Sequence, residues 1–193
     1  MVGGNLNAVV AEEVIAPIKL DIGCGPNKKE GYVGIDILPF DGKVDHVFNA
    51  GTERWPFEDG SVDEAHSSHF VEHLTAPERI HFVNELHRVM KTGAKAAIIT
   101  PHWCSNRAYG DLTHQWPPVS EMWFYYLDQK WRDGNAPHTD AKHNPKGYSC
   151  DFEATWGYSL HPGIQSRNPE YQQHAMQFWK EAVQDTYATV TKR

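Results

Sequence analysis

The sequence lacks the features that are typical of membrane, secreted and nucleic-acid-binding proteins. No apolar run is long enough to span a bilayer, and residues 1–14 have neither the basic start nor the apolar block of a secretory leader. The three cysteines are too few, and odd in number, for a disulfide framework, which favours a reducing compartment. The sequence has 18 Lys and Arg against 25 Asp and Glu, which gives a net charge of -7, and it contains no run of basic residues. We therefore expect a cytoplasmic protein that contacts neither membranes nor nucleic acid.

The first hundred residues carry the pattern of an α/β protein. Short segments with apolar residues at 18–22, 32–37, 44–48 and 96–100 predict strands, and a further strand is expected at 62–67. A helix is expected from the capping box Thr75-Ala-Pro-Glu78 to a C-terminal cap at Gly93, with apolar residues at helical spacing between them. This order predicts a largely parallel sheet, and the length of 193 residues fits a single domain over 1–193.

The second half of the chain is less regular. Residues 102–150 are rich in Trp, Tyr, His and Pro, and we interpret them as an aromatic-rich insertion, partly helical around 120–130, that shapes the substrate site. Apolar residues alternate with polar ones over 152–160, which predicts a half-buried strand. A short helix is expected from Asn168 to about Lys180, and β-forming residues at 186–191 predict a final strand. The two late strands are expected to form an antiparallel pair.

Two glycines at the end of the first strand and an acid at the end of the second predict a nucleoside-binding site. The glycines allow close approach of the backbone, and Asp36 can accept both ribose hydroxyl protons. A dinucleotide fits this pattern poorly, because Lys28 stands where the third glycine of the dinucleotide fingerprint belongs. Asp36 also follows Gly25 by eleven residues, where that fingerprint needs about 20. S-adenosylmethionine has no phosphate and does not need the helix that a pyrophosphate uses.

These residues and others that follow them in order resemble the class I S-adenosylmethionine-dependent methyltransferase family. The resemblance covers residues 18–101 and rests on Leu20-Asp-Ile-Gly-Cys-Gly25, Gly34-Ile-Asp36, Phe48-Asn-Ala50, Trp55-Pro-Phe57, Ser61-Val-Asp63-Glu-Ala65, Ser67-Ser-His-Phe-Val-Glu-His73-Leu74 and Glu85-Leu-His-Arg-Val-Met-Lys91-Thr-Gly93. It implies a Rossmann-like, mostly parallel seven-stranded sheet with a reversed terminal strand, in a small member with a shortened first loop and helix.

The resemblance also implies a set of cofactor-binding residues. The methionine end of the cofactor would meet the glycine turn, the ribose would meet Asp36, the adenine would lie near Asn49, and the serines after the fourth strand would face the reactive side. The full set is Asp21, Gly23, Cys24, Gly25, Asp36, Ile37, Asn49, Ala50, Ser67 and Ser68. Asn49 departs from the acid that is frequent at this position in the family, and its amide carbonyl can still accept a hydrogen bond from an amine.

Methyl transfer to a small-molecule acceptor is therefore the expected function. The donor is already activated, so a base is needed only where the acceptor must lose a proton. Our candidates for that base are His69 and His114, and the candidate acceptor-binding residues are His102, Trp103, Tyr109 and Asp111. The fourth strand is not followed by the Asn/Asp-Pro-Pro-Tyr motif of amino-methylating enzymes. The three cysteines form no Cys-x-x-Cys pair, and no metal is expected.

Two other functions stay open at this point. The chain could bind S-adenosylmethionine or S-adenosylhomocysteine without transferring a methyl group, or it could bind a different adenosine-type ligand such as a nucleotide.

Overall fold

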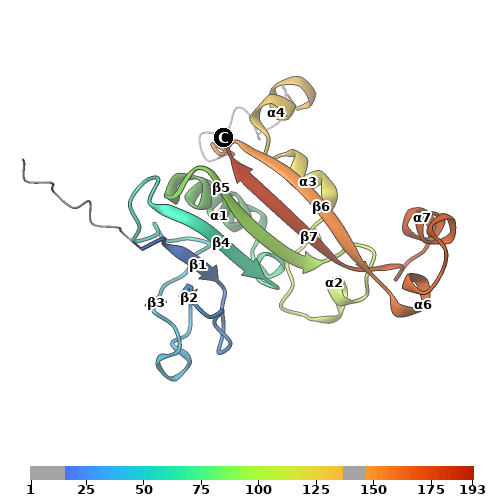
Figure 1. The fold of residues 1–193 in the computed structure, drawn as a ribbon, viewed down its shortest axis with the longest axis horizontal. Helices are drawn as coiled ribbons and strands as arrows, with labels where there is room; N and C mark the ends of the chain where they lie inside the picture. Colours follow the sequence, from blue (N-terminus) through green and yellow to red (C-terminus); the bar gives the residue numbers. More distant parts are fainter. Residues whose placement is uncertain (1–15, 137–146) are drawn as a thin grey trace, which may run out of the picture.

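The computed structural model describes residues 16–136 and 147–193, which form a single seven-stranded sheet with helices packed on it (Figure 1). In chain order the strands are β1 (Lys19–Ile22), β2 (Val33–Asp36), β3 (His46–Val47), β4 (Val62–Ser68), β5 (Met90–Pro101), β6 (Phe152–Leu160) and β7 (Val183–Lys192). The strand order across the sheet is β3-β2-β1-β4-β5-β7-β6.

Only the terminal strand β7 runs against the others. It pairs antiparallel with β5 on one side and with β6 on the other, while all remaining pairs are parallel. The expected mostly parallel sheet with a reversed last strand is therefore confirmed, and so is the late antiparallel pair. The carboxyl ends of β1, β2, β4 and β5 consequently meet at one edge of the sheet, where ligands of open α/β sheets bind.

Helix α1 (Ala76–Val89) begins as the sequence predicts. The Thr75 amide donates to Glu78 Oε2 at 2.7 Å, which is one half of a capping box. The predicted end at Gly93 is wrong, because the helix stops at Val89 and β5 begins at Met90. Met90 is buried and pairs with Val62, so the chain leaves the helix early to place this side chain in the core. Gly93 has a positive φ of 81° but lies within β5.

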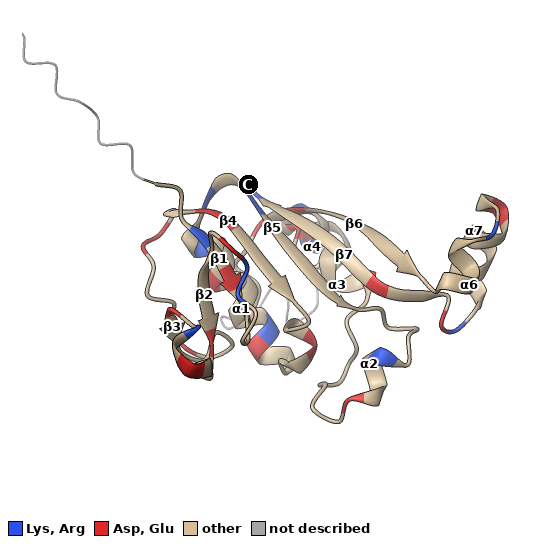
Figure 2. Cartoon of the chain, turned by 60° about the horizontal axis from the view of Figure 1, so that its bottom comes forward, with Lys and Arg blue, Asp and Glu red and all other residues tan. Residues whose placement is uncertain are grey.

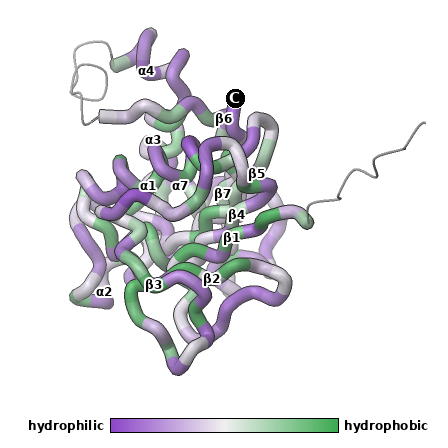
Figure 3. The backbone as a smooth tube through the Cα atoms, turned by 90° about the vertical axis from the view of Figure 1, so that its left-hand side faces the viewer, coloured by the Kyte–Doolittle hydropathy of each residue, from purple (hydrophilic) through white to green (hydrophobic). Residues whose placement is uncertain are grey.

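The core lies between α1 and one face of the sheet. Phe82, Val83 and Leu86 of α1 pack in one cluster with apolar side chains of β1 and β5. Figure 3 shows hydrophobic stretches in the strands near the middle of the view and a hydrophilic α4 at the top. The opposite face carries polar side chains such as Lys19 and Glu64, which form an ion pair of 2.8 Å.

The aromatic-rich segment contains the short helices α2 (Arg107–Gly110), α3 (Glu121–Tyr125) and α4 (Gln129–Asn135), which confirms the helical content expected near 120–130. The remaining helical elements are η1 (Phe40–Gly42), η2 (Val71–His73), α6 (Pro162–Gln165) and α7 (Pro169–Phe178). None of the helices in 16–136 and 147–193 has the length and hydropathy needed to cross a bilayer.

Candidate active site

The glycine turn after β1 closes onto the end of β2. The amides of Gly23 and Cys24 both donate to the carbonyl oxygen of Ile35, at 2.9 and 3.2 Å. Gly23 and Gly25 have positive φ angles of 70° and 54°, a conformation that glycine adopts at the least cost. A Cβ atom on Gly23 would lie 2.4 Å from Cδ2 of Phe70, so this position has no room for a side chain.

Asp36 and the glycine turn are in direct contact. Asp36 Oδ2 accepts from the Gly25 amide at 2.9 Å, and Oδ1 accepts from the Leu38 amide at 3.1 Å. A carboxylate has about four acceptor sites, so these two bonds fix the orientation of the group and leave further sites for a ligand. The structure therefore brings together the two sequence features that first indicated a nucleoside site.

A cavity of about 190 Å³ lies at this edge of the sheet. Among the predicted cofactor residues, Gly23, Asp36, Ile37, Asn49 and Ala50 line it together. Phe70, His73, Leu74 and Glu78 complete much of the wall, and the sequence did not mark them as a group. The carbonyl oxygen of the Asn49 side chain accepts from the Gly51 amide at 2.9 Å, so one of its acceptor sites is already used.

Asp21 and Cys24 do not line this cavity. Asp21 Oδ2 accepts from the Lys29 amide at 2.8 Å, and Oδ1 lies 2.7 Å from His66 Nδ1, so the carboxylate holds the short loop after β1. Burial, together with the nearby carboxylates of Asp21 and Asp36, raises the pKa of the Cys24 thiol to about 11. A thiol with this pKa stays protonated at neutral pH and is not a nucleophile.

Three predicted residues follow one another where β4 ends. Ser67 is buried, and its Oγ has no hydrogen-bond partner among the described residues. Ser68 is half-buried, and His69 has a positive φ of 53° while its amide donates to the Ile99 carbonyl at 2.9 Å. This backbone bond holds the strained residue at the end of β5, next to the cavity wall that Phe70 forms.

Carboxylates flank the His69 ring on both sides. Its Nδ1 lies 3.2 Å from Glu72 Oε1, and its Nε2 lies 4.0 Å from Asp185 Oδ1. The contact with Glu72 raises the pKa of His69 above 6.5, although burial of the ring acts in the opposite direction. No pattern in the sequence marked Asp185. It reaches this edge because β7 pairs antiparallel with β5, which places Asp185 opposite Pro101.

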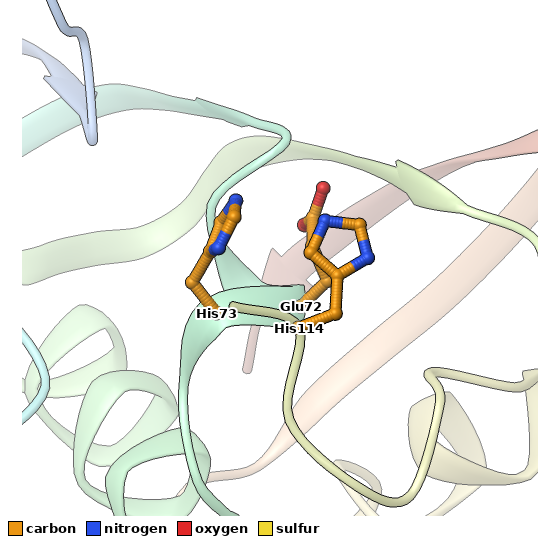
Figure 4. Close-up of side chains that lie close together, drawn as sticks. All are labelled: Glu72, His73 and His114. Carbon is orange, nitrogen blue, oxygen red and sulfur yellow. The ribbon is translucent and has the colours of Figure 1, made fainter. Parts of the chain in front are cut away.

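His114, the second candidate base, lies on the loop after α2 and approaches a different neighbour. Its ring meets that of His73 edge-on, with centroids 4.7 Å apart. The next residue, Gln115, donates its amide to the Glu72 carbonyl at 2.8 Å and so ties this loop to η2. His114 therefore belongs to a cluster with Glu72 and His73, which Figure 4 shows.

The candidate acceptor residues fall into two places. His102 and Trp103 line a second cavity, of about 380 Å³, together with Glu121, Tyr158 and residues of α7. The strands that line this second cavity are β6 and β7, through Tyr158 and Val183. They lie at the opposite side of the sheet from β2 and β3 (Figure 1). Tyr109 and Asp111 are exposed and line neither this cavity nor the one at Asp36.

Glu121, which the sequence did not single out, organises the second cavity. It accepts from Trp103 Nε1 at 3.0 Å and from the Tyr158 hydroxyl at 3.0 Å, and it lies 2.7 Å from His102 Nε2. Burial acts to raise the pKa of Glu121, but the hydrogen bonds, led by that with His102, lower it to about 2. A further cavity of about 470 Å³ lies where β4 begins, away from the carboxyl ends of the strands.

Comparison with known proteins agrees with this geometry. A family model described as a methyltransferase domain matches residues 20–98. A SAM-dependent methyltransferase from Archaeoglobus fulgidus superposes with a TM-score of 0.62 at 20% identity, covering 92% of this chain and 86% of that chain. The geranyl diphosphate C-methyltransferase of Streptomyces coelicolor A3(2) gives 0.53 at 13% identity, covering 92% of this chain and 71% of that chain.

At these identities the two structures establish the fold, whereas the family model matches the sequence itself. No curated protein matches the chain in sequence. The predicted resemblance over 18–101 and the matched residues 20–98 cover nearly the same segment. The glycine turn, Asp36 and the cavity wall at Asn49 all fall within it. Residues 20–98 thus match a methyltransferase domain in sequence, and the chain is similar in fold to S-adenosylmethionine-dependent methyltransferases.

Proposed function

We propose that this protein transfers a methyl group from S-adenosylmethionine to a small-molecule acceptor. The observation that carries the proposal is that Gly23, Asp36 and Asn49 line one cavity at the carboxyl ends of β1 and β2. The cavity fits an adenosyl group, because Asp36 keeps acceptor sites for ribose hydroxyls and the Gly23 backbone, which carries no side chain, forms part of the wall. The S-adenosylmethionine expected from the sequence is also the cofactor type of the Archaeoglobus enzyme.

The short first loop favours this cofactor over a dinucleotide. Residues 26–31, between the glycine turn and β2, contain turns and no helix. A pyrophosphate would therefore lack the helix N-terminus that normally stabilises its charge. An S-adenosylmethionine molecule carries no phosphate, so the same loop is sufficient for it.

The residues at the end of β4 support a role on the acceptor side. The cofactor supplies a methyl group on a sulfonium, and the protein must align the acceptor with it. His69 lies between Glu72 and Asp185, and both Glu72 Oε1 and Asp185 Oδ1 are buried without hydrogen-bond partners among the described residues. His69 is our candidate to take a proton from an acceptor hydroxyl or amine. Ser67 Oγ, two residues earlier in the chain, is buried without a hydrogen-bond partner among the described residues.

The aromatic-rich segment 102–150 supports a small acceptor. Part of it, the loop with His114, lies against η2 near the cofactor cavity, and another part forms the cavity at Glu121. Lys and Arg appear as short, separated segments along the ribbon in Figure 2, without the continuous basic stripe that nucleic-acid binding favours. The insertion is therefore our candidate for the acceptor-binding element.

The proposal is tested by calorimetry of the full chain with S-adenosylmethionine and S-adenosylhomocysteine. We expect strongly weakened binding by Asp36→Ala, which removes one negative charge from the cavity wall. The control Glu30→Ala removes one negative charge from an exposed residue outside the cavity and should bind like the wild type. If the wild type binds neither S-adenosylmethionine nor S-adenosylhomocysteine at millimolar concentration, the proposal is wrong. Formation of S-adenosylhomocysteine with a panel of hydroxyl and amine acceptors then separates an enzyme from a protein that only binds the cofactor.

A further inference from the structure

Glu72, His73 and His114 form a cluster that the sequence does not reveal. Glu72 and His73 end the short helix η2, whereas His114 lies on the loop after α2, far along the chain. One potential ligand atom from each residue lies within 4.8 Å of the other two. Figure 4 shows the three side chains pointing the same way from the two segments. The cluster is thus a feature of the tertiary structure, with no spacing motif behind it.

The two segments are fixed against each other by a buried arginine. Arg79, which is 5% exposed, donates through NH2 to the carbonyl oxygens of Glu72 at 3.4 Å and Gln115 at 3.1 Å. The Gln115 amide also donates to the Glu72 carbonyl at 2.8 Å. These bonds hold His114 beside η2 independently of any ligand, so the cluster is preorganised.

Hydrogen bonds define which ring nitrogen of each histidine is free. His114 Nδ1 lies 3.3 Å from the Ala108 carbonyl, which can only accept, so Nδ1 carries the proton and Nε2 keeps its lone pair. Thr113 Oγ1 donates to Asp111 Oδ1 at 2.7 Å and therefore accepts from His73 Nδ1 at 3.0 Å. Both imidazoles then have a lone pair on Nε2, in the arrangement by which proteins orient metal-binding histidines, and Asp111 Oδ2 lies 4.0 Å from Nε2 of His114.

Glu72 supplies a buried oxygen that makes no hydrogen bond to the described residues. The residue is 4% exposed, and its Oε1 makes no hydrogen bond to any of the described residues. The His69 Nδ1 lies 3.2 Å from this atom and forms an ion pair with it when the ring is protonated. Oε2 accepts from Thr100 Oγ1 at 3.3 Å, which orients the group. A buried carboxyl oxygen without a hydrogen bond is costly, and a cation would lower that cost.

We propose that Glu72, His73 and His114 bind a divalent transition metal, with Zn²⁺ as the best match. Two imidazole nitrogens and one carboxylate oxygen are a donor set of catalytic zinc sites, in which the fourth position stays open for water or substrate. His73 is exposed and His114 is half-buried, so solvent has access to the site.

The position of this site suggests what the open coordination position would take. His73 also lines the cofactor cavity, so the metal would lie on the boundary between that cavity and the insertion. In an inference that rests on the proposed function, the remaining ligand is an oxygen of the acceptor. A metal-bound hydroxyl loses its proton more readily than a free one, which would assist attack on the methyl group.

The test is calorimetry of the chelator-stripped full chain with ZnCl₂, together with visible absorption spectra after addition of CoCl₂. We expect one tight site, which His73→Gln and His114→Gln each weaken by more than about 100-fold, because outer-shell partners alone contribute 10 to 100-fold. Thr113→Val, which removes one such partner, is expected to weaken binding by about 10-fold. His174→Gln, on the exposed surface of α7, is the matched control and should bind like wild type.

Two results would overturn the proposal: no Zn²⁺ binding by the wild type, or binding that survives unchanged in both His73→Gln and His114→Gln. Circular dichroism of each variant shows whether it is folded, and His114 lies on a surface loop where a substitution leaves the core intact. S-adenosylmethionine binding is measured in the same samples. Cofactor binding without Zn²⁺ binding rejects the metal site alone, and Zn²⁺ binding without cofactor binding rejects the proposed function alone.

Discussion

The glycine turn allows a quantitative test, because its two glycines have similar backbones but different surroundings. In Gly23→Ala, the left-handed backbone costs about 1–2 kcal/mol for a residue with a Cβ. The new Cβ would also lie 2.4 Å from Cδ2, 2.5 Å from Cγ and 2.7 Å from Cβ of Phe70. Rotating the Phe70 ring cannot relieve the last contact, so the backbone must shift, at about 1–3 kcal/mol for overpacking. We expect a total loss of about 2–5 kcal/mol in the free energy of unfolding.

Gly25→Ala is the matched control for this prediction. It has a φ of 54°, yet a Cβ there would have no heavy atom within 4 Å, so only the backbone term of about 1–2 kcal/mol applies. Urea denaturation followed by tryptophan fluorescence measures both losses. Truncating Phe70 to Ala in the Gly23→Ala background removes the ring contacts at 2.4 and 2.5 Å but keeps the contact with Cβ at 2.7 Å. It should therefore recover part of the overlap term, which appears as a coupling energy in a double-mutant cycle. Equal losses for the two glycine variants, or no coupling to Phe70, would refute the reasoning.

Three further predictions concern the ligand site, the second cavity and the buried arginine. Asp36→Ala removes the two expected charged hydrogen bonds to the ribose, each of which contributes about 1.5–3 kcal/mol. Calorimetry should therefore show an affinity for S-adenosylmethionine that is reduced by roughly 10²–10⁴-fold, whereas the affinity of Glu30→Ala should be unchanged. The pKa of Glu121 is lowered from 4.5 to about 2 in the folded state, so its contribution to stability is present above pH 4.5 and is lost as pH falls toward 2. Acid unfolding of Glu121→Gln should therefore show a weaker pH dependence in that window, and an unchanged slope would contradict the assigned bond to His102. Arg79→Met leaves buried carbonyl oxygens without donors and should lower the free energy of unfolding by at least about 3 kcal/mol in urea denaturation, whereas a loss below 1 kcal/mol would contradict its role as a clamp.

The fold could be predicted from the sequence because its signals are local. At the ligand edge β1, β2 and β5 contain apolar runs that end at a glycine, an acid or a proline, and α1 begins at a capping box. The end of α1 could not be predicted, because Gly93 has the residue type and even the positive φ of a helix cap. The helix ends at Val89 because Met90 is buried and pairs with Val62, a contact between distant segments that the local sequence pattern does not encode.

The cofactor side of the site was predictable for the same reason. Gly23, Gly25 and Asp36 lie on consecutive strands, and neighbouring parallel strands bring their ends together. His102 was expected on the same edge because it follows a strand that ends there. Its amide instead donates to the carbonyl of Gln184, and the side chain turns toward Glu121 and the β6–β7 edge. Its role in acceptor binding stays a prediction that concerns this second cavity.

The acceptor side depends on contacts that no spacing rule describes. Glu72 and His73 come from the segment after β4, His114 comes from the insertion, and Asp185 comes from the reversed strand β7. Each alone resembles an ordinary surface or helix-entry residue, and only the tertiary structure places them around His69 and η2. A parallel sheet brings side chains from distant segments together at one edge. The cofactor motif lies on consecutive strands and can be recognised in the sequence, whereas the groups on the acceptor side can be assigned only from the fold. For this reason the binding of Zn²⁺ by His73→Gln and His114→Gln is the sharper test of the acceptor side, because that prediction owes nothing to the sequence motif.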